Sequence, residues 1–140
     1  MRGVTFGKKH SYRAYGLLLK EYPIFTAPKP KTKLIEVPGS DAVIDLTESL
    51  TGKVPYGTRK GIFEFTVMGG RSKWPAVYAA LLNDLHGKRM QIVLDDDPNY
   101  FYLGRVEIDS WASDKVTATI VIVAEVEPHK HRRHGNGGML

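Results

Sequence analysis

Apolar and polar residues alternate along three stretches of the chain, which is typical of strands that bury one face. The clearest stretch is Arg59–Met68, and two more follow at Tyr100–Ile108 and Val116–Glu127. In the last stretch apolar residues occupy both sets of alternate positions, which predicts a middle that is buried on both faces. Shorter strands are predicted around Phe6, at Leu34–Val37 and at Met90–Leu94.

A period of three to four residues marks one helix at about 72–86. Ser72 is the predicted N-cap, Pro75 suits the first turn, and Gly87 is the predicted left-handed end. One apolar stripe faces a core: it consists of Trp74, Val77, Tyr78, Leu81, Leu82 and Leu85. About six strands with frequent turns and one helix predict a mainly β domain, a β-barrel or sandwich with the helix packed on the sheet.

The segment APKPKTK, residues 27–33, contains two prolines and three lysines. Proline lacks a backbone donor and fixes φ, so this segment is predicted to be an extended connection or an exposed arm. Pro38-Gly39 signals a turn after the next strand, and the polar stretch DLTESLTG that follows has no clear pattern. We expect a single domain at 1–128 that carries this arm.

Composition fits a soluble globular protein of 140 residues, with 42% hydrophobic and 25% charged residues. The sequence has no cysteine, which excludes disulfides, thiolate metal sites and a cysteine nucleophile. No apolar run approaches the roughly 20 residues of a membrane-spanning helix, so we expect no membrane contact. The N-terminus also lacks the apolar core of a signal peptide.

The net charge of +5 is unevenly distributed. Residues 129–140 contain Lys130, Arg132 and Arg133 and no acid, which leaves 20 − 3 = 17 bases against 15 acids, or +2, elsewhere. We predict a flexible basic tail at 129–140, either a disordered end or a functional arm. Its histidines, His129, His131 and His134, are expected to bind metal only adventitiously.

The segment LDDDPNYFYLGRV contains three adjacent aspartates. Neighbouring strand residues point to opposite faces, so Asp95, Asp96 and Asp97 are not expected to converge on a metal ion. The alternating oxygens and glycine of a calcium loop are missing, whereas Pro98 and Asn99 favour a turn. The sequence has no dinucleotide, P-loop or serine-hydrolase fingerprint either. We therefore predict a hairpin turn that faces solvent or a neighbouring subunit, and no catalytic residue, metal or cofactor.

The aromatic residues after this turn allow two interpretations. Tyr100 and Tyr102 share a face of the predicted strand, with Arg105 nearby. Such a platform stacks bases in single-strand-binding proteins, but it equally suits a contact with another subunit. A small β-barrel nucleic-acid-binding module that uses these residues and the basic tail is our alternative hypothesis.

Three blocks of the sequence, in this order and spacing, resemble a known family. They are GKKHSYRAYGLLL, then VPGSDAVIDLTESLTG with YGTRKGIFEFTV, then LHGKRMQIVLDDDPNYFYLGRVEIDSW with ASDKVTATIVIVAEVEP. Together they resemble the distal tail protein (Dit) family of long-tailed bacteriophages and prophages, specifically its N-terminal ring-forming domain. The resemblance covers the chain from about Phe6 to Pro128.

The resemblance implies a non-enzymatic virion protein at the tail tip, assembled in the host cytoplasm. It implies a β-barrel-like domain related to tail-tube proteins that forms a hexameric ring between tail tube and baseplate hub. Implied partners are further copies of the chain, the tail tube protein, the tail hub or tail-associated lysin protein and the tape-measure protein, with DNA only in transit. The C-terminal carbohydrate-module-like domain of many members is not expected here.

Contacts between subunits are expected at the arm and at the loop 37–52. Asp41, Asp45 and Glu48 are predicted to pair with bases such as Arg59 or Arg71, either across an interface or within one chain. Asp45→Lys would then shift the assembly toward monomer. The candidate contact residues are Lys29, Lys31, Asp41, Asp45, Glu48, Arg59, Asp96, Tyr100 and Tyr102.

Overall fold

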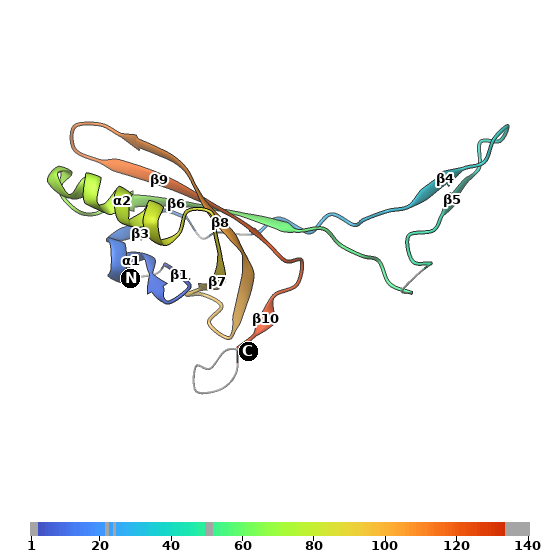
Figure 1. Ribbon diagram of the computed structural model, residues 1–140, viewed down its shortest axis with the longest axis horizontal. Helices are drawn as coiled ribbons and strands as arrows, with labels where there is room; N and C mark the ends of the chain where they lie inside the picture. Colours follow the sequence, from blue (N-terminus) through green and yellow to red (C-terminus); the bar gives the residue numbers. More distant parts are fainter. Residues whose placement is uncertain (1–2, 22, 24, 50–51, 134–140) are drawn as a thin grey trace.

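The computed structural model describes residues 3–21, 23, 25–49 and 52–133, which form a curled sheet with a long projecting ribbon (Figure 1). The strands are β1 (Val4–Phe6), β2 (Lys9–His10), β3 (Leu17–Leu19), β4 (Leu34–Glu36), β5 (Val43–Asp45), β6 (Arg59–Val67), β7 (Lys88–Leu94), β8 (Tyr100–Ser113), β9 (Ala118–Val126) and β10 (His131–Arg132). The helices are α1 (Ser11–Tyr15), the 3-10 turn η1 (Arg71–Lys73) and α2 (Trp74–Asp84).

The main sheet is antiparallel and contains eight strands in the order β2-β1-β7-β8-β9-β6-β3, with β10 added beside β8. The three long strands β8, β9 and β6 curl around the two helices, and β8 has a register shift between Ile108 and Ser110. Because β2 and β3 do not pair with each other, the sheet is an open half-barrel. The predicted mainly β fold with one main helix on the sheet is confirmed.

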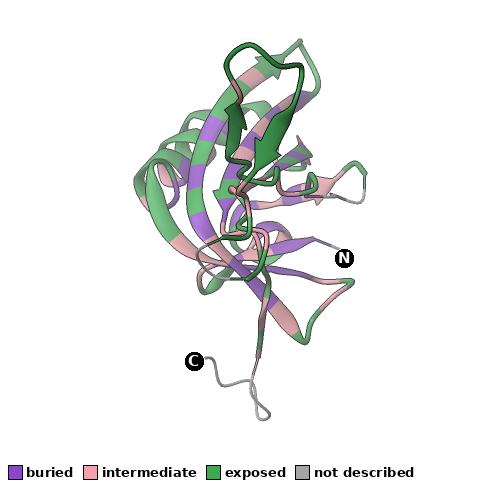
Figure 2. Cartoon of the chain, turned by 90° about the vertical axis from the view of Figure 1, so that its right-hand side faces the viewer, coloured by how far each residue is buried: buried purple, intermediate pink, exposed green. Residues whose placement is uncertain are grey.

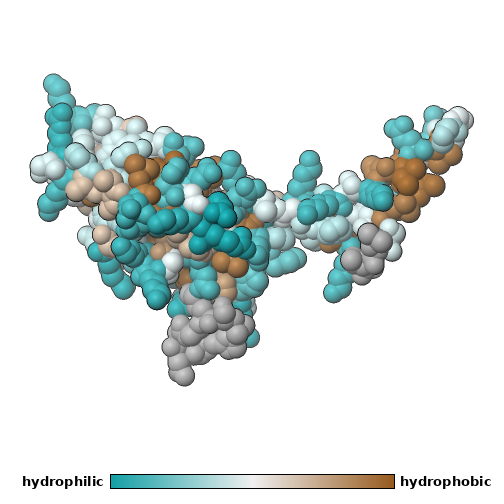
Figure 3. Space-filling view, viewed as in Figure 1, coloured by the Kyte–Doolittle hydropathy of each residue, from teal (hydrophilic) through white to brown (hydrophobic). Residues whose placement is uncertain are grey.

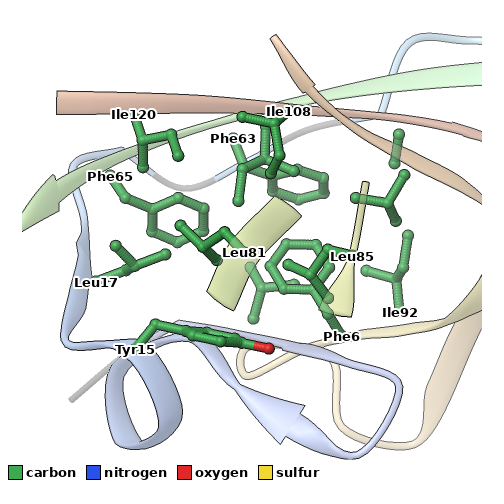
Figure 4. Packing of buried hydrophobic residues seen from close by; sticks show 14 of the residues in the cluster. Phe6, Tyr15, Leu17, Phe63, Phe65, Leu81, Leu85, Ile92, Ile108 and Ile120 are labelled. Carbon is green, nitrogen blue, oxygen red and sulfur yellow. The ribbon is translucent and has the colours of Figure 1, made fainter. Parts of the chain in front are cut away.

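The core lies between the inner face of the half-barrel and helix α2 (Figure 4). Phe63 and Phe65 project inward from β6 and are fully buried, as their alternation predicts. Phe6 contacts both of them edge-to-face, with centroids 5.6 and 6.3 Å apart. Leu81 of α2 and Leu85, the C-cap residue of α2, close this layer from the other side. Burial of each such side chain contributes roughly 1.5–3 kcal/mol, so this layer supplies much of the stability.

Helix α2 is shorter than predicted and begins differently. Ser72 does not cap it, because η1 leads directly into the helix and Lys73 takes the N-cap position without a side-chain bond. Pro75 lies in the first turn, as predicted, and Gly87 adopts a φ of 76° just beyond the end. The predicted apolar stripe is only partly buried, since Tyr78 and Leu82 remain exposed.

The last hairpin also differs from the prediction. The predicted strand begins at Val116, but this residue lies in the β8–β9 turn and is 82% exposed. The Asp114 carboxylate forms that turn by accepting hydrogen bonds from the backbone N–H groups of Val116 and Thr117, both at 2.7 Å. Val121 and Val123 are half-buried, so the middle of β9 is fully buried on one face only.

The short helix α1 follows β2 directly and was not predicted from the sequence. His10 stabilises its start, because the Nδ1 atom accepts a hydrogen bond from the backbone N–H of Tyr12 at 3.2 Å. Gly16 ends it in the left-handed region at φ 68°. None of the helices in the described ranges is long and apolar enough to cross a membrane.

Candidate functional site

The ribbon that projects from the half-barrel is a two-stranded arm made of residues 26–60 (Figure 1). We divide it into a stem, residues 26–33 and 53–60, and a tip, residues 34–49, where β4 and β5 pair with Ile35 opposite Ile44. The predicted extended segment 27–33 is the outgoing half of the stem. Outside the β4–β5 ladder, backbone N–H groups donate to carbonyl oxygens across the arm from Thr26 to Lys60 (2.9 Å), from Gly57 to Lys29 (2.8 Å), from Lys31 to Pro55 (2.7 Å), from Leu46 to Lys33 (2.7 Å) and from Val37 to Ala42 (3.3 Å).

Three side chains fix the root of the arm to the half-barrel. Phe25 is 3% exposed, and its ring stacks on that of Tyr102 with centroids 4.0 Å apart. Arg59 donates from Nε to the Thr26 carbonyl oxygen at 2.8 Å and from Nη2 to that of Phe25 at 3.3 Å. The Arg59 guanidinium also lies 5.5 Å from the centre of the Tyr102 ring. Residues that are distant in sequence thus set where the arm leaves the sheet.

This arrangement changes the interpretation of two candidate contact residues. Tyr102 is 8% exposed, so the predicted exposed platform of Tyr100 and Tyr102 is wrong for Tyr102. The Phe25 ring covers it, and Tyr102 belongs to the core cluster. Arg59 is committed to the backbone of its own chain, and it forms no ion pair with a carboxylate in the described part of the arm.

The tip exposes apolar side chains on both faces of the small β4–β5 sheet. Leu34 is 58% exposed and Val43 is 55% exposed, and Ile35 and Ile44 are also exposed. The space-filling view shows this apolar surface at the far end of the arm (Figure 3), and the turned cartoon shows the tip exposed almost throughout (Figure 2). An apolar surface of this kind on a projecting hairpin is typical of a binding surface.

Besides Arg59, the arm carries five candidate contact residues, all exposed: Lys29, Lys31, Asp41, Asp45 and Glu48. Asp45 accepts hydrogen bonds from the backbone and hydroxyl groups of Thr47, which lowers the pKa of its carboxyl below the usual range. Ion pairs of Asp41, Asp45 or Glu48 with Arg59 or Arg71 do not occur among the described residues. The structure brings these acids together at the tip, away from both arginines.

The acidic run Asp95–Asp97 forms the predicted hairpin turn between β7 and β8. Asp95 accepts a hydrogen bond from the backbone N–H of Gly3 and contacts His10 Nε2, both at 2.8 Å. Asp97 pairs with Lys130 Nζ at 2.7 Å. Asp96 is exposed. The turn therefore holds the first and last described segments of its own chain.

Within the predicted basic tail at 129–140, residues 129–133 lie against the sheet. The strand β10 pairs with the start of β8, and the His131 ring stacks on Phe101 with centroids 5.1 Å apart. His131 Nε2 lies 2.9 Å from Glu127, and this contact, with a smaller contribution from Arg89, lowers the pKa of the Glu127 carboxyl. Residues 134–140, including His134, lie outside the described residues.

Lys130 covers the second candidate tyrosine. Its Nζ atom lies 4.4 Å from the centre of the Tyr100 ring, so this half-buried ring has a cation above it within the same chain. Among the described residues, no group of three or more histidine, aspartate or glutamate side chains is arranged to hold a metal ion.

A polar contact between the two helices could not be inferred from the sequence. Tyr15 Oη donates to Asp84 Oδ2 at 2.9 Å, and Lys9 Nζ reaches the same oxygen at 2.9 Å. Burial, followed by the hydrogen bond to Asp84, raises the pKa of the Tyr15 hydroxyl. Lys9 and Tyr15 in turn lower the pKa of the Asp84 carboxyl. The contact links α1 to α2.

Comparison with known proteins identifies the fold. No family profile and no curated protein matches the sequence. The crystal structure of SPP1 Dit (gp 19.1), described as a paradigm of the hub adsorption apparatus in Gram-positive infecting phages, matches with a TM-score of 0.74. The match covers 94% of this chain and 52% of that chain at 14% identity, so this chain spans about half the length of that protein. The half-barrel with its arm has a Dit-like fold, as the sequence resemblance implies.

Proposed function

We propose that the protein is a distal tail component of a bacteriophage, forming a ring that joins the tail tube to the baseplate hub. The observation that carries this proposal is the match of 94% of the chain to SPP1 Dit, a protein of a phage hub adsorption apparatus. The arrangement of the motifs in the sequence supports the same assignment independently of the fold.

The arm gives the proposal a physical basis. Leu34, Ile35, Val43 and Ile44 are exposed on a hairpin that has left its own core. Removal of apolar surface from water stabilises an assembly by about 25 cal/mol per Å² buried, so these side chains favour contact with another molecule. In a ring each subunit has two neighbours, and an arm that reaches beyond its own domain suits that arrangement.

The partners that follow from this function are further copies of the chain, in a hexamer, together with the tail tube protein and the tail hub or tail-associated lysin protein. The tape-measure protein and DNA would pass through the channel. The protein would act at the tail tip of the virion, without a cofactor and without catalysis.

Light scattering coupled to gel filtration, with negative-stain electron microscopy, tests the proposal. A mass near six times 15.7 kDa and annular particles are the expected result. Because a tail ring can require its neighbour for assembly, the measurement is repeated in the presence of a tail tube protein from the same phage. A chain that remains monomeric in both conditions would contradict the proposal.

The nucleic-acid-binding alternative loses support because Tyr102 is buried against Phe25. Fluorescence anisotropy with a labelled single-stranded oligonucleotide at two salt concentrations distinguishes the two functions. Salt-dependent binding by a monomer would favour the alternative.

A further inference from the structure

Charge is segregated along the arm. The stem carries six basic residues and no acidic residue, whereas the tip carries four acidic residues and no basic residue. The bases of the stem are Lys29, Lys31, Lys33, Lys53, Arg59 and Lys60. The acids of the tip are Glu36, Asp41, Asp45 and Glu48. One arm therefore presents two surfaces of opposite charge at different distances from the half-barrel.

Several of these charges have no opposite charge paired with them among the described residues. In the described residues, Lys29, Lys31 and Lys33 form no ion pair, and neither do Asp41 and Glu48. The arm is extended, so its own tip cannot fold back on its own stem without breaking the hydrogen bonds between its two halves (Figure 1). Each surface is open to a second molecule.

The two surfaces also match in their apolar content. The tip exposes Leu34, Ile35, Val43 and Ile44, and the stem exposes the ring of Tyr56, which is 38% accessible. Pro30, on the opposite half of the arm, lies across from Tyr56, and Pro55 precedes Tyr56 on the same half. Both prolines are also exposed. An interface needs apolar contact at its centre and charge at its rim, and both are available here.

From the charge segregation and the unpartnered apolar tip, we propose that the tip of one copy docks on the stem of the next copy. This inference rests on the proposed ring and names the surfaces that build it. The contact is heterologous, since two different surfaces meet, and repetition of a heterologous contact closes a ring when its rotation permits. Two copies joined tip to tip or stem to stem would place like charges together, which is unfavourable.

The reach of the arm is adequate for such a contact. At about 3.3 Å per residue, the outgoing half from Thr26 to Pro38 spans roughly 40 Å, which exceeds the diameter of a small domain. The tip can therefore pass the half-barrel of its own copy and meet the stem of a neighbour.

Charge reversal tests the inference. The tip variant carries Asp41→Lys, Asp45→Lys and Glu48→Lys, and the stem variant carries Lys29→Glu, Lys31→Glu and Lys33→Glu. A sixfold variant combines both sets. The control, with the same change in net charge as the stem variant but on the half-barrel, carries Lys8→Glu, Lys73→Glu and Lys115→Glu. Circular dichroism confirms that each variant is folded, and light scattering measures its mass.

The tip and stem variants alone should each dissociate, with an apparent dissociation constant raised at least about tenfold. An equimolar mixture should recover the oligomer, because the basic tip of one variant fits the acidic stem of the other. The sixfold variant should also recover it, and the control should resemble the wild type. High salt should weaken the wild-type oligomer.

The outcomes of these experiments distinguish failure of the tip-to-stem contact from failure of the proposed ring. An oligomer that persists unchanged in both variants would overturn the tip-to-stem contact and leave the proposed ring intact. Dissociation without recovery on mixing would also overturn it, since complementarity is then not the cause. A wild-type chain that is monomeric both alone and with the tail tube protein would overturn the ring and this contact together.

Discussion

The aromatic ring of Phe25 stacks on that of Tyr102 with centroids 4.0 Å apart, at the point where the arm leaves the half-barrel. Phe25→Ala removes this stack and the edge contact with Phe63 at 5.6 Å. Deletion of a buried phenylalanine side chain destabilises a domain by about 3–5 kcal/mol. We expect a loss in that range in urea denaturation. The exposed Tyr56→Ala is the control and should lose less than about 1 kcal/mol. Equal losses in the two variants would show that Phe25 is not an anchor.

Two glycines should differ in their tolerance of a methyl group. A Cβ added at Gly104 would lie 2.1 Å from the carbonyl oxygen of Glu125, which belongs to the paired strand and cannot move alone. A Cβ added at Gly61 would lie 2.5 Å from Phe25 Cε1, a side-chain atom. Gly61→Ala should therefore lose about 1–3 kcal/mol of unfolding free energy, and Gly104→Ala should lose more. Gly70→Ala, which meets no atom within 4 Å, is the control.

A double-mutant cycle identifies the atom responsible at Gly61. If the Phe25 ring causes the loss, Gly61→Ala should be nearly neutral in a Phe25→Ala background. If the losses of unfolding free energy in the two single variants add up in the double variant, the added methyl group is destabilising through the backbone and not through the Phe25 ring.

Tyr15 should make the protein sensitive to alkaline conditions. Its pKa is raised in the native state by burial, then by Asp84, above the value of about 10 in an unfolded chain. Above pH 10 the native state therefore holds more protons than the unfolded state, so stability falls as pH rises. Tyr15→Phe should therefore reduce the slope of the unfolding free energy against pH. The reduction should correspond to a difference of up to about one bound proton between the two states. Urea denaturation at pH values from about 9 to about 11.5, which bracket the pKa of an unfolded tyrosine, measures this slope. Tyr56→Phe is the control. An unchanged slope would contradict the prediction.

Asp97 should protect the C-terminal strand from proteolysis. Its ion pair with Lys130 at 2.7 Å helps to hold β10 against β8. Trypsin cleaves after Lys130, Arg132 and Arg133, so Asp97→Asn should accelerate cleavage there because the segment opens more often. Mass spectrometry of timed digests gives the rate, and Asp109→Asn on the half-barrel is the matched control. Identical rates in the two variants would show that this ion pair does not hold β10.

The strands with a long alternating pattern could be predicted from the sequence, because the alternation of apolar and polar residues is visible within a single stretch of the chain. Phe63 and Phe65 identify β6 without any knowledge of its neighbours. The strand β5 could not be found in this way, since Val43–Asp45 is extended only through its pairing with β4. The short strand β10 has the same origin, because His131 is positioned by Phe101, a residue distant in sequence.

The candidate contact residues show the same limit. The prolines and lysines of 27–33 marked an exposed segment, and the structure places them on the arm. The returning half, which contains Pro55 and Tyr56, has no alternating pattern, so the length of the arm was not predictable. Tyr102 was misjudged because a strand pattern shows which residues share a face and not which face is covered; its cover is Phe25, on another segment.

The arm leaves and re-enters the sheet at one point, since Thr26 and Lys60 are hydrogen-bonded neighbours. The arm between these two residues is therefore a loop whose two ends are held together at its root. The entropic cost of closing a loop rises only slowly with its length. Matched insertions or deletions in both halves would leave the half-barrel unchanged. Evolution can therefore adjust the length of the arm independently of the domain that carries it.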